Sequence, residues 1–301
     1  MLLPEQTIEY TELNLLNFRE KQVQVTVARL DLIHPVVSGN KLYKLFYFIK
    51  DAEVSGYETL LTFGGAYSNH LLATAYASHQ LGFKSIGIVR GERSTVLSHT
   101  LEQCVEYEMQ LQFVSRDEYN TLQHPGQESE LLDRYGKCVI IPEGGYAPRG
   151  ASGASLIMKH DQIRNATHVC TAVGTATTLA GLLTGSAPGQ EIIAVPVLKG
   201  MHDIPQRIKF LSDKDCSFNL SIFIQYHFGG YARHTVELTN FMNELFRQTH
   251  VPTDFVYTAK MMYAVCDQIR KGYFPPGSTI MCIHTGGLQG NLSLPAGTIV
   301  F

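Results

Sequence analysis

The sequence predicts an α/β fold in which helices cover parallel sheets. Three observations lead to this prediction. Short apolar runs rich in β-branched residues alternate with longer segments of helical period, glycine-rich turns end several of these runs, and no internal repeat or low-complexity tract breaks the alternation. At 301 residues with 45% hydrophobic residues, the chain is long enough for two domains or one elaborate domain.

The first half of the chain contains predicted strands, because several of its runs are apolar and stop at a turn signal. They cover residues 59–63, 84–90, 111–114 and 138–141. Helical period predicts helices between them at residues 69–81, 95–109 and 117–135. Proline and glycine at residues 124–126 interrupt or end the last of these helices.

The same reasoning applies to the second half of the chain. It predicts strands at residues 167–173, 191–198, 221–226 and 279–284, and helices at residues 178–185, 235–248 and 257–272. Turns at residues 64–70, 174–178 and 285–287 each follow a strand. Because open α/β sheets bind ligands beyond the carboxyl ends of their strands, these turns are the predicted location of a functional site.

Charge and composition exclude several classes of function. The formal net charge is −3, the pI is about 6.5 and no block of lysine and arginine is present, so nucleic acid is not a predicted partner. No uncharged run reaches the ~18–20 residues that cross a bilayer, so no membrane association is predicted. The first residues carry acids and lack the basic start of a secretory signal, and we therefore expect a cytoplasmic protein.

The six cysteines are scattered, form no Cys-x-x-Cys pair and lie in several cases within apolar runs. They are Cys104, Cys138, Cys170, Cys216, Cys266 and Cys282. We interpret them as buried thiols in a reducing compartment rather than as disulfide partners or metal ligands, and we predict no metal site.

A glycine- and threonine-rich turn follows the strand at residues 167–173 and opens a helix. It consists of Gly174, Thr175, Ala176, Thr177 and Thr178. Backbone N–H groups, hydroxyls and the helix dipole converge at such a point, which favours binding of a phosphate. The turn lacks the Gly-Lys of a P-loop and the spacing of a dinucleotide fingerprint, which disfavours ATP and NAD. A tight packing turn is the alternative interpretation.

Two further segments carry candidate functional side chains. Lys41 and Lys44 follow a Ser-Gly-Asn turn; on one face of a helix start, their mutual repulsion and partial burial lower the pKa of an amine, which can then form a Schiff base. A solvated helix surface is the alternative. The turn at residues 64–70 brings Ser68, Asn69 and His70 to a helix start, where Ser68 or Asn69 suits an N-cap and His70 suits either a proton carrier or a structural role.

Six motifs occur in one order along the chain. They are Gly-Asn-Lys-x-x-Lys-Leu at 39–45, Gly-Gly-x-x-Ser-Asn-His at 64–70, Pro-Glu-Gly-Gly at 142–145, the turn at 174–178, Tyr-Thr-Ala-Lys at 257–260 and His-Thr-Gly-Gly at 284–287. Together they resemble the pyridoxal-phosphate (PLP) enzymes of the 1-aminocyclopropane-1-carboxylate deaminase and D-cysteine desulfhydrase family. The resemblance extends over nearly the whole chain, from about residue 37 to residue 288.

The resemblance implies a fold-type II PLP enzyme of the tryptophan-synthase β-subunit-like class. Such a fold has two three-layer α/β domains, each containing a parallel sheet, with the cofactor in the cleft between them. The larger, PLP-binding domain is expected to comprise residues 1–51 and 153–301, and the smaller inserted domain residues 52–152. Family members are often dimers, so a homodimer is expected.

The resemblance also implies a role for individual residues. Lys41 is expected to hold PLP covalently and to move the α-proton of the substrate, with Lys44 as a second lysine beside the cofactor. Asn69 is expected to bond the hydroxyl of the PLP ring, and Ser68 to face the substrate. The turn at residues 174–178 corresponds to the phosphate-binding loop.

Three aromatic or hydroxyl side chains complete the expected site. Tyr231 and Tyr257 correspond to active-site tyrosines, and Thr258 to the residue that meets the pyridine nitrogen of PLP. A hydroxyl there stabilises a carbanion less than a carboxylate does, which favours β-elimination over racemisation or transamination. The resemblance places glutamate at this position in the ring-opening deaminases and threonine in the desulfhydrase-like members.

Three places depart from the family pattern. Tyr43 stands where arginine is usual, Tyr67 where glutamine is usual, and Ala176 and Thr177 where glycines are usual.

The resemblance therefore implies an enzyme, a PLP-dependent lyase or deaminase of a small amino acid. The favoured activity is that of a D-cysteine desulfhydrase, giving pyruvate, ammonia and sulfide. The first alternative is a 1-aminocyclopropane-1-carboxylate deaminase giving 2-oxobutyrate and ammonia. Two alternatives come from other classes: a PLP-binding protein without catalytic activity, and a sugar-phosphate or nucleotide enzyme that uses residues 174–178 without PLP.

Overall fold

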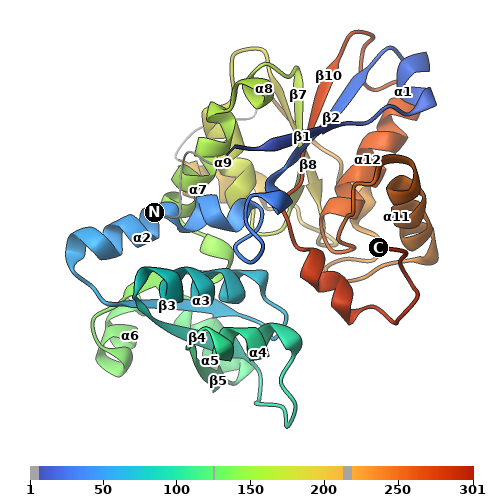
Figure 1. Ribbon diagram of the computed structural model, residues 1–301. Coiled ribbons are helices and arrows are strands. Elements are labelled where there is room, and N and C mark those ends of the chain that lie inside the picture. Colours follow the sequence, from blue (N-terminus) through green and yellow to red (C-terminus); the bar gives the residue numbers. More distant parts are fainter. Residues whose placement is uncertain (1–6, 125, 213–218) are drawn as a thin grey trace.

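The chain folds around two β-sheets, which lie one above the other in Figure 1. The computed structural model describes residues 7–124, 126–212 and 219–301. The larger sheet has the strand order β1-β2-β10-β7-β8-β9 and is parallel except for β1, which pairs antiparallel with β2. Its strands are β1 (Glu9–Glu12), β2 (Gln24–Arg29), β7 (His168–Val173), β8 (Glu191–Pro196), β9 (Leu220–Ile222) and β10 (Thr279–Ile283).

The smaller sheet is wholly parallel, with the strand order β5-β4-β3-β6. Its strands are β3 (Thr59–Gly64), β4 (Lys84–Arg90), β5 (Gln110–Val114) and β6 (Val139–Ile141). Alternate residues of β3 enter different cores: Leu61 and Phe63 pack with α5 (Arg116–Leu122) and α6 (Glu128–Tyr135), whereas Leu60 joins the core that contains α3 (Asn69–Leu81). The smaller sheet is therefore the middle of three layers.

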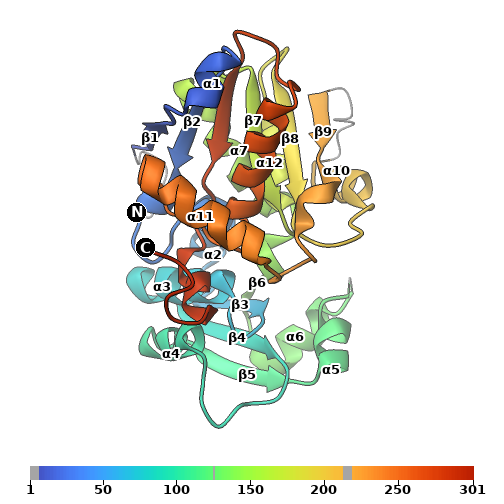
Figure 2. The same cartoon turned by 90° about the vertical axis from the view of Figure 1, so that its right-hand side faces the viewer.

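Helices cover both faces of the larger sheet as well (Figure 2). On one face lie α2 (Asn40–Ser55), α7 (Pro148–Ser155), α9 (Thr177–Gly185) and α10 (Ile204–Ser212). On the other lie α1 (Leu16–Glu20) and α12 (Thr258–Arg270), with α11 (Val236–Thr249) packed against α12. The central strands β7, β8 and β10 are buried on both faces, which accounts for their largely apolar sequences.

Close helix contacts place α2 firmly against the larger sheet's helices. A Cβ atom at Gly153 of α7 would lie 2.0 Å from the Tyr43 carbonyl oxygen of α2. A Cβ atom at Gly181 of α9 would lie 2.6 Å from the Ala151 carbonyl oxygen. The glycines of α7 and α9 thus let three helix backbones approach to distances that no side chain would allow.

Most predicted elements are confirmed. The helix at residues 69–81 and the strand at residues 84–90 have the bounds that the sequence predicted, and α5 and α6 are separate helices on either side of the predicted break. The predicted helix at 95–109 is shorter, since α4 runs from His99 to Glu106. The end of the predicted strand at 221–226 is instead a 3-10 turn, η5 (Ile224–His227).

The structure also bears on the predicted domain boundaries and on the predicted state of the cysteines. The predicted domain boundaries fall inside α2 and α7, the helices that connect the sheets, and the division itself stays a prediction.

Cys104, Cys138, Cys170, Cys266 and Cys282 are free and buried, whereas Cys216 and Pro125 lie outside the described residues. Within the described ranges, no helix is both long and apolar enough to cross a membrane, and no cluster of three histidine, cysteine or acidic side chains suits a metal ion.

Candidate active site

The start of α2 is fixed by a glycine that no other residue could replace. Gly39 has φ = +70°, and a Cβ atom there would lie 1.9 Å from the Thr285 carbonyl oxygen. The next residue, Asn40, donates from Nδ2 to Thr178 Oγ1 at 2.7 Å and accepts at Oδ1 from Lys41 Nζ at 2.6 Å. Asn40 therefore connects the lysine of α2 to the start of α9.

Both lysines of α2 lie in an environment that disfavours their charge. Burial lowers the pKa of Lys41 to about 8, and the nearby Asp254 carboxylate opposes this shift. Burial and the charge of Lys41 hold the pKa of Lys44 well below its usual range, and Lys44 Nζ donates to the Gly144 carbonyl at 3.1 Å. The side chain of Lys44 is not part of a solvated helix surface.

His70 is buried on α3 next to these lysines. Burial, then the charges of Lys44 and Lys41, lower the pKa of His70 to about 3, with the Pro142 carbonyl opposing the shift. The imidazole is therefore neutral at neutral pH, which favours the structural role over that of a proton carrier.

The turn at residues 174–178 forms the entry to α9. Gly174 leaves room for the Tyr257 ring, since a Cβ atom at Gly174 would lie 3.2 Å from Tyr257 Cε1. The hydroxyls of Thr175 and Thr177 are 2.9 Å apart. Ala176 adopts φ = +69° at the helix N-cap, a left-handed conformation that costs a non-glycine residue about 1 kcal/mol. The unpaired N–H groups of the first helical turn converge here.

The turn at residues 64–70 contains a helix-capping serine and a buried asparagine oxygen that has no hydrogen-bond partner among the described residues. Ser68 is the N-cap of α3 and its hydroxyl accepts from the Leu71 N–H at 3.3 Å, so the N-cap prediction is confirmed. Asn69 follows it, and its Oδ1 atom is buried without a hydrogen-bond partner among the described residues. A Cβ atom at Gly287 would lie 3.3 Å from Asn69 Nδ2. The 285–287 turn of the larger sheet thus meets the start of α3.

The start of α12 contains a buried carboxylate that the sequence analysis missed. Asp254 Oδ2 accepts from the N–H groups of Val256 and Tyr257 at 3.0 and 2.9 Å, and Oδ1 accepts from the Thr258 N–H at 2.8 Å and the Thr258 hydroxyl at 2.7 Å. Neither Asp254 nor Thr258 has exposed surface. An aspartate just before a helical pattern is an N-cap signal, which could have revealed Asp254.

The two predicted active-site tyrosines are in contact. Tyr257 donates from its hydroxyl to that of Tyr231 at 3.4 Å, and the rings meet edge to face with centroids 6.0 Å apart. Tyr231 is 53% exposed, whereas burial and the neighbouring phenol hold the pKa of Tyr257 well above its usual range. The pair therefore extends from the buried start of α12 to the surface.

A buried ion pair holds the turn that follows β10. Arg29 Nη2 lies 2.6 Å from Asp31 Oδ2, and Asp31 Oδ1 lies 3.2 Å from His284 Nδ1. His284 Nε2 lies 2.8 Å from the Pro252 carbonyl. This cluster ties the ends of β2 and β10 together just before Thr285, the residue that Gly39 contacts.

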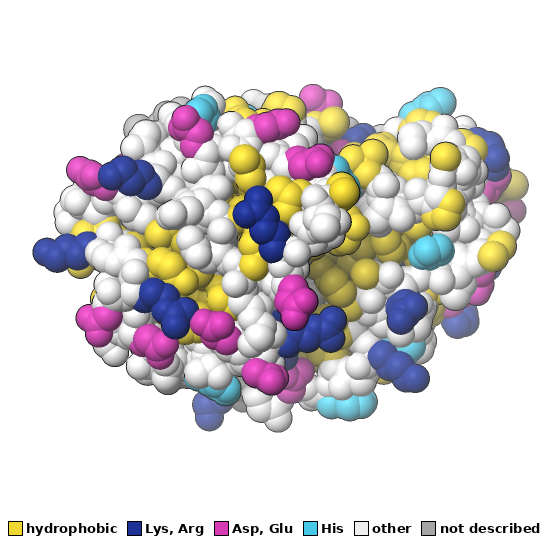
Figure 3. All heavy atoms as spheres, turned by 90° about the horizontal axis from the view of Figure 1, so that it is seen from below, with side chains coloured by type: hydrophobic (Ala, Val, Ile, Leu, Met, Phe, Trp, Pro, Cys, Tyr) yellow, Lys and Arg dark blue, Asp and Glu magenta, His cyan; other side chains and the backbone are white. Residues whose placement is uncertain are grey.

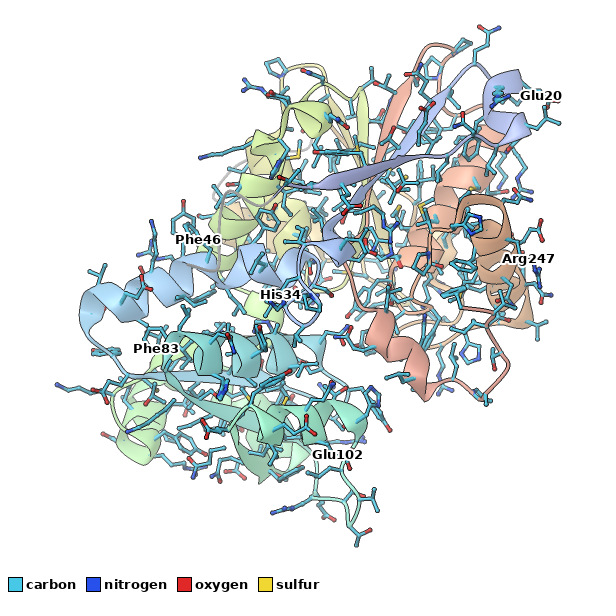
Figure 4. The ribbon with its side chains drawn as sticks, viewed as in Figure 1. Glu20, His34, Phe46, Phe83, Glu102 and Arg247 are labelled. Atoms are coloured by element: carbon cyan, nitrogen blue, oxygen red, sulfur yellow. The ribbon has the colours of Figure 1, made fainter. Side chains whose placement is uncertain are left out.

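The structure thus gathers most predicted site residues at the boundary between the two sheets. The start of α2 contacts the 285–287 turn and α9, and that turn contacts α3 and Asp254. His34, in the loop before α2, lies at the same boundary (Figure 4), with its ring 4.8 Å from that of Tyr76 on α3. Seen from below, the molecule has a hollow lined largely by hydrophobic side chains (Figure 3).

Comparison with known proteins identifies the family. The family described as pyridoxal-phosphate dependent enzyme matches residues 5–286. The chain belongs to this family. It is therefore an enzyme of the fold-type II class that depends on PLP, as the sequence motifs predicted.

Individual relatives and solved structures agree with this assignment. A Pyrococcus abyssi protein named "Putative 1-aminocyclopropane-1-carboxylate deaminase" is 30% identical over 290 residues, which cover 90% of this chain and 87% of that protein. A Thermotoga maritima protein of the same name is 30% identical over 284 residues, covering 88% and 89%. The crystal structure of an ACC deaminase homologue matches with a TM-score of 0.80 and 26% identity, covering 97% of this chain and 92% of that one. O-ureido-L-serine synthase, at 15% identity and a TM-score of 0.69, shares the fold.

The residues at the site fit PLP. Lys41 supplies an amine of lowered pKa, and Asn69 supplies a buried oxygen with no partner among the described residues. The start of α9 has no side-chain cap, so its first backbone N–H groups are of the kind that bind a phosphate at a helix N-terminus.

Proposed function

We propose that the protein is a PLP-dependent lyase that acts on a small amino acid, with D-cysteine as substrate and pyruvate, ammonia and sulfide as products. The observation that carries the proposal is the environment of Lys41, an amine whose pKa is lowered to about 8 and which is linked through Asn40 to Thr178. Bound PLP supplies an electron sink for the α-carbon of an amino acid.

Proton transfer and the binding of PLP and substrate are assigned to Lys41 and the residues around it. Lys41 is in part neutral near pH 7, so its Nζ atom can take a proton from the α-carbon and return it. Lys44 lies beside Gly144, where a Cβ atom would be 3.0 Å from Thr175 Cγ2, and we assign it to the phosphate together with residues 174–178. Asn69 Oδ1 is assigned to the ring hydroxyl and the Ser68 hydroxyl to the substrate.

The start of α12 supports elimination rather than ring opening. Its carboxylate, Asp254, uses both oxygens for the N–H groups and hydroxyl of residues 256–258. Thr258 donates its hydroxyl proton to Asp254, so it brings no negative charge to a pyridine nitrogen. Without such a charge a carbanion is less delocalised, and early loss of a β-substituent is favoured. Tyr231 and Tyr257 are assigned to the substrate side of the site.

One observation favours a second candidate. Relatives about 30% identical over most of this chain are named as 1-aminocyclopropane-1-carboxylate deaminases. Opening the cyclopropane ring of that substrate would give 2-oxobutyrate and ammonia. The two activities differ in their first step, because the α-carbon of 1-aminocyclopropane-1-carboxylate carries no hydrogen. Elimination from D-cysteine begins with removal of the α-proton by Lys41, whereas ring opening begins with the break of a carbon–carbon bond of the cyclopropane.

Assembly and location are proposed from the family resemblance and the sequence. We propose a homodimer, for which light scattering should give twice the 33.5 kDa of one chain. We also propose a cytoplasmic location and an inserted smaller domain formed by residues 52–152. Expression of that segment alone tests the domain, since its failure to fold would contradict the division.

The test of the proposed activity is keto-acid release by the PLP-saturated protein. D-cysteine, D-serine, their L-enantiomers and 1-aminocyclopropane-1-carboxylate are compared, with Lys41→Ala as the control. Pyruvate with sulfide from D-cysteine supports the proposal, and 2-oxobutyrate from the cyclopropane supports the second candidate. A borohydride-reducible adduct retained by Lys41→Ala would contradict the role of Lys41, and the absence of every product despite bound PLP would show a protein without this catalysis.

A further inference from the structure

A lysine outside α2 is buried and takes no part in the steps above. Lys260 has no exposed surface, and its Nζ atom donates to the Gly230 carbonyl oxygen at 2.7 Å. Burial lowers the pKa of Lys260 to about 8, and the charge of Asp254 opposes this shift. Burial of an amine is unfavourable unless it makes good hydrogen bonds, so the bond to Gly230 accounts for its place here.

The partner of Lys260 belongs to a segment that runs along α12 in the opposite direction. At the far end of the helix, the Tyr226 hydroxyl donates to Asp267 Oδ2 at 2.6 Å. One turn nearer the site, the rings of Phe228 and Tyr263 meet edge to face with centroids 4.9 Å apart. Lys260 provides the contact at the following turn.

The last contact of this segment is the tyrosine pair of the active site. Tyr257 is the N-cap of α12 and lies three residues before Lys260. Tyr257 contacts Tyr231, and Lys260 contacts Gly230, the residue before it. Lys260 is therefore the attachment nearest to Tyr231.

The backbone of this segment needs such an attachment. Phe228, Gly229, Gly230 and Ala232 have φ values of +48°, +89°, +115° and +52°. Left-handed conformations are unfavourable for the two non-glycine residues and are maintained only where surrounding contacts fix them. Tyr231 is 53% exposed, so burial of its ring contributes little to holding the loop.

We propose that Lys260 is a positioning residue: its ammonium holds the Gly230 carbonyl and thereby keeps Tyr231 against Tyr257 at the active site. The proposal depends on the proposed function only in that Tyr231 acts on the substrate. The structural half, the attachment of the loop, is independent of which substrate is used.

Hydrogen exchange of the PLP-loaded protein tests the attachment without any substrate. Lys260→Met keeps the aliphatic volume and removes the ammonium, and Lys260→Arg restores a donor. Lys209→Met is the control, because Lys209 is an exposed lysine near the end of another helix, α10. We expect exchange at residues 229–232 to become about tenfold faster in Lys260→Met, as loss of a hydrogen bond from a charged donor predicts. Exchange in these residues that stays at the wild-type rate would overturn the proposal.

Kinetics test whether the attachment acts through Tyr231. We expect Lys260→Met to lower kcat/KM about ten- to hundredfold in wild-type background and by less than about threefold when Tyr231 is already phenylalanine. Equal losses in both backgrounds would show that Lys260 does not act through Tyr231. If no amino acid is turned over, the proposed function fails while the exchange experiment still decides the attachment.

A second variant covers the case in which Lys260→Met does not fold. Gly230→Ala disturbs the loop at φ = +115° without touching α12, and the added Cβ would meet Lys199 only at an ordinary 3.5 Å. We expect the same faster exchange and the same loss of kcat/KM, cancelled by Tyr231→Phe. A loop loosened by Gly230→Ala with unchanged kcat/KM would refute the positioning of Tyr231.

Discussion

The lowered pKa of Lys41 predicts how fast the protein captures its cofactor at different pH values. Only the neutral amine attacks the PLP aldehyde. With a pKa of about 8, roughly one tenth of Lys41 is neutral at pH 7, against ~0.03% of an ordinary lysine with a pKa of 10.5, a difference of ~300-fold. Since the pKa is lowered, the neutral fraction rises as pH increases and levels off above about 8.

The measurement is stopped-flow absorbance after PLP is mixed with the cofactor-free protein, between pH 6 and pH 10. We expect the rate to rise about tenfold per pH unit up to a plateau that begins near pH 8. The same series with free propylamine corrects for the titration of PLP itself, and Lys41→Arg identifies the reacting amine. A corrected rate that continues to rise through pH 10 would refute the argument, because Lys41 would then titrate as an ordinary surface lysine.

Three further substitutions test the scaffold of the site. Gly39→Ala places a Cβ atom 1.9 Å from the Thr285 carbonyl oxygen and should lower the free energy of unfolding, measured in urea, by more than about 4 kcal/mol. The control Gly56→Ala, at φ = +66° in open space, should lower it by about 1 kcal/mol. Equal losses would argue against the close approach. Asp254→Ala leaves buried N–H groups without an acceptor and should cost about 3 kcal/mol by the same method, and a loss under about 1 kcal/mol would show that water replaces the carboxylate. Thr178→Val removes the acceptor of Asn40 and should weaken PLP binding about tenfold by absorbance titration, and unchanged affinity would mean that Asn40 positions Lys41 without it.

Local patterns were sufficient to predict most of the fold. The strands β3, β4 and β6 of the smaller sheet are largely apolar runs that end at glycine or proline, and α3 has both an N-cap serine and a C-terminal glycine. The strand β2 was missed although residues 24–27 alternate polar side chains with valine, which is a strand signal. Its place in the sheet depends on β1 on one side and on β10, about 250 residues later in the chain, on the other, and no local pattern shows the second pairing.

The candidate site likewise contains residues that the sequence predicted and residues that it missed. Glycines and hydroxyl residues located the turns that carry Lys41, Asn69 and residues 174–178, and the resemblance of the motifs to the family supplied their expected roles. Asp254 was missed although its contacts are local, with the backbone of residues 256–258. Lys260 was missed because its burial depends on a distant segment, through the Gly230 carbonyl. A single lysine in a helical pattern predicts a solvated side chain, and only the packing of residues 226–231 along α12 reverses that expectation.

The pairing of β2 with β10 also sets the order in which the enzyme can assemble. The smaller sheet uses residues 59–141 and can form from contacts within that stretch, whereas β2 completes its pairing only with a strand made about 250 residues later. Gly39 rests on Thr285, just beyond β10, so the helix that carries Lys41 obtains its final starting point only when that strand has docked. In a nascent chain the start of α2 therefore reaches its final position only after β10 has been made, so the site around Lys41 forms late in folding.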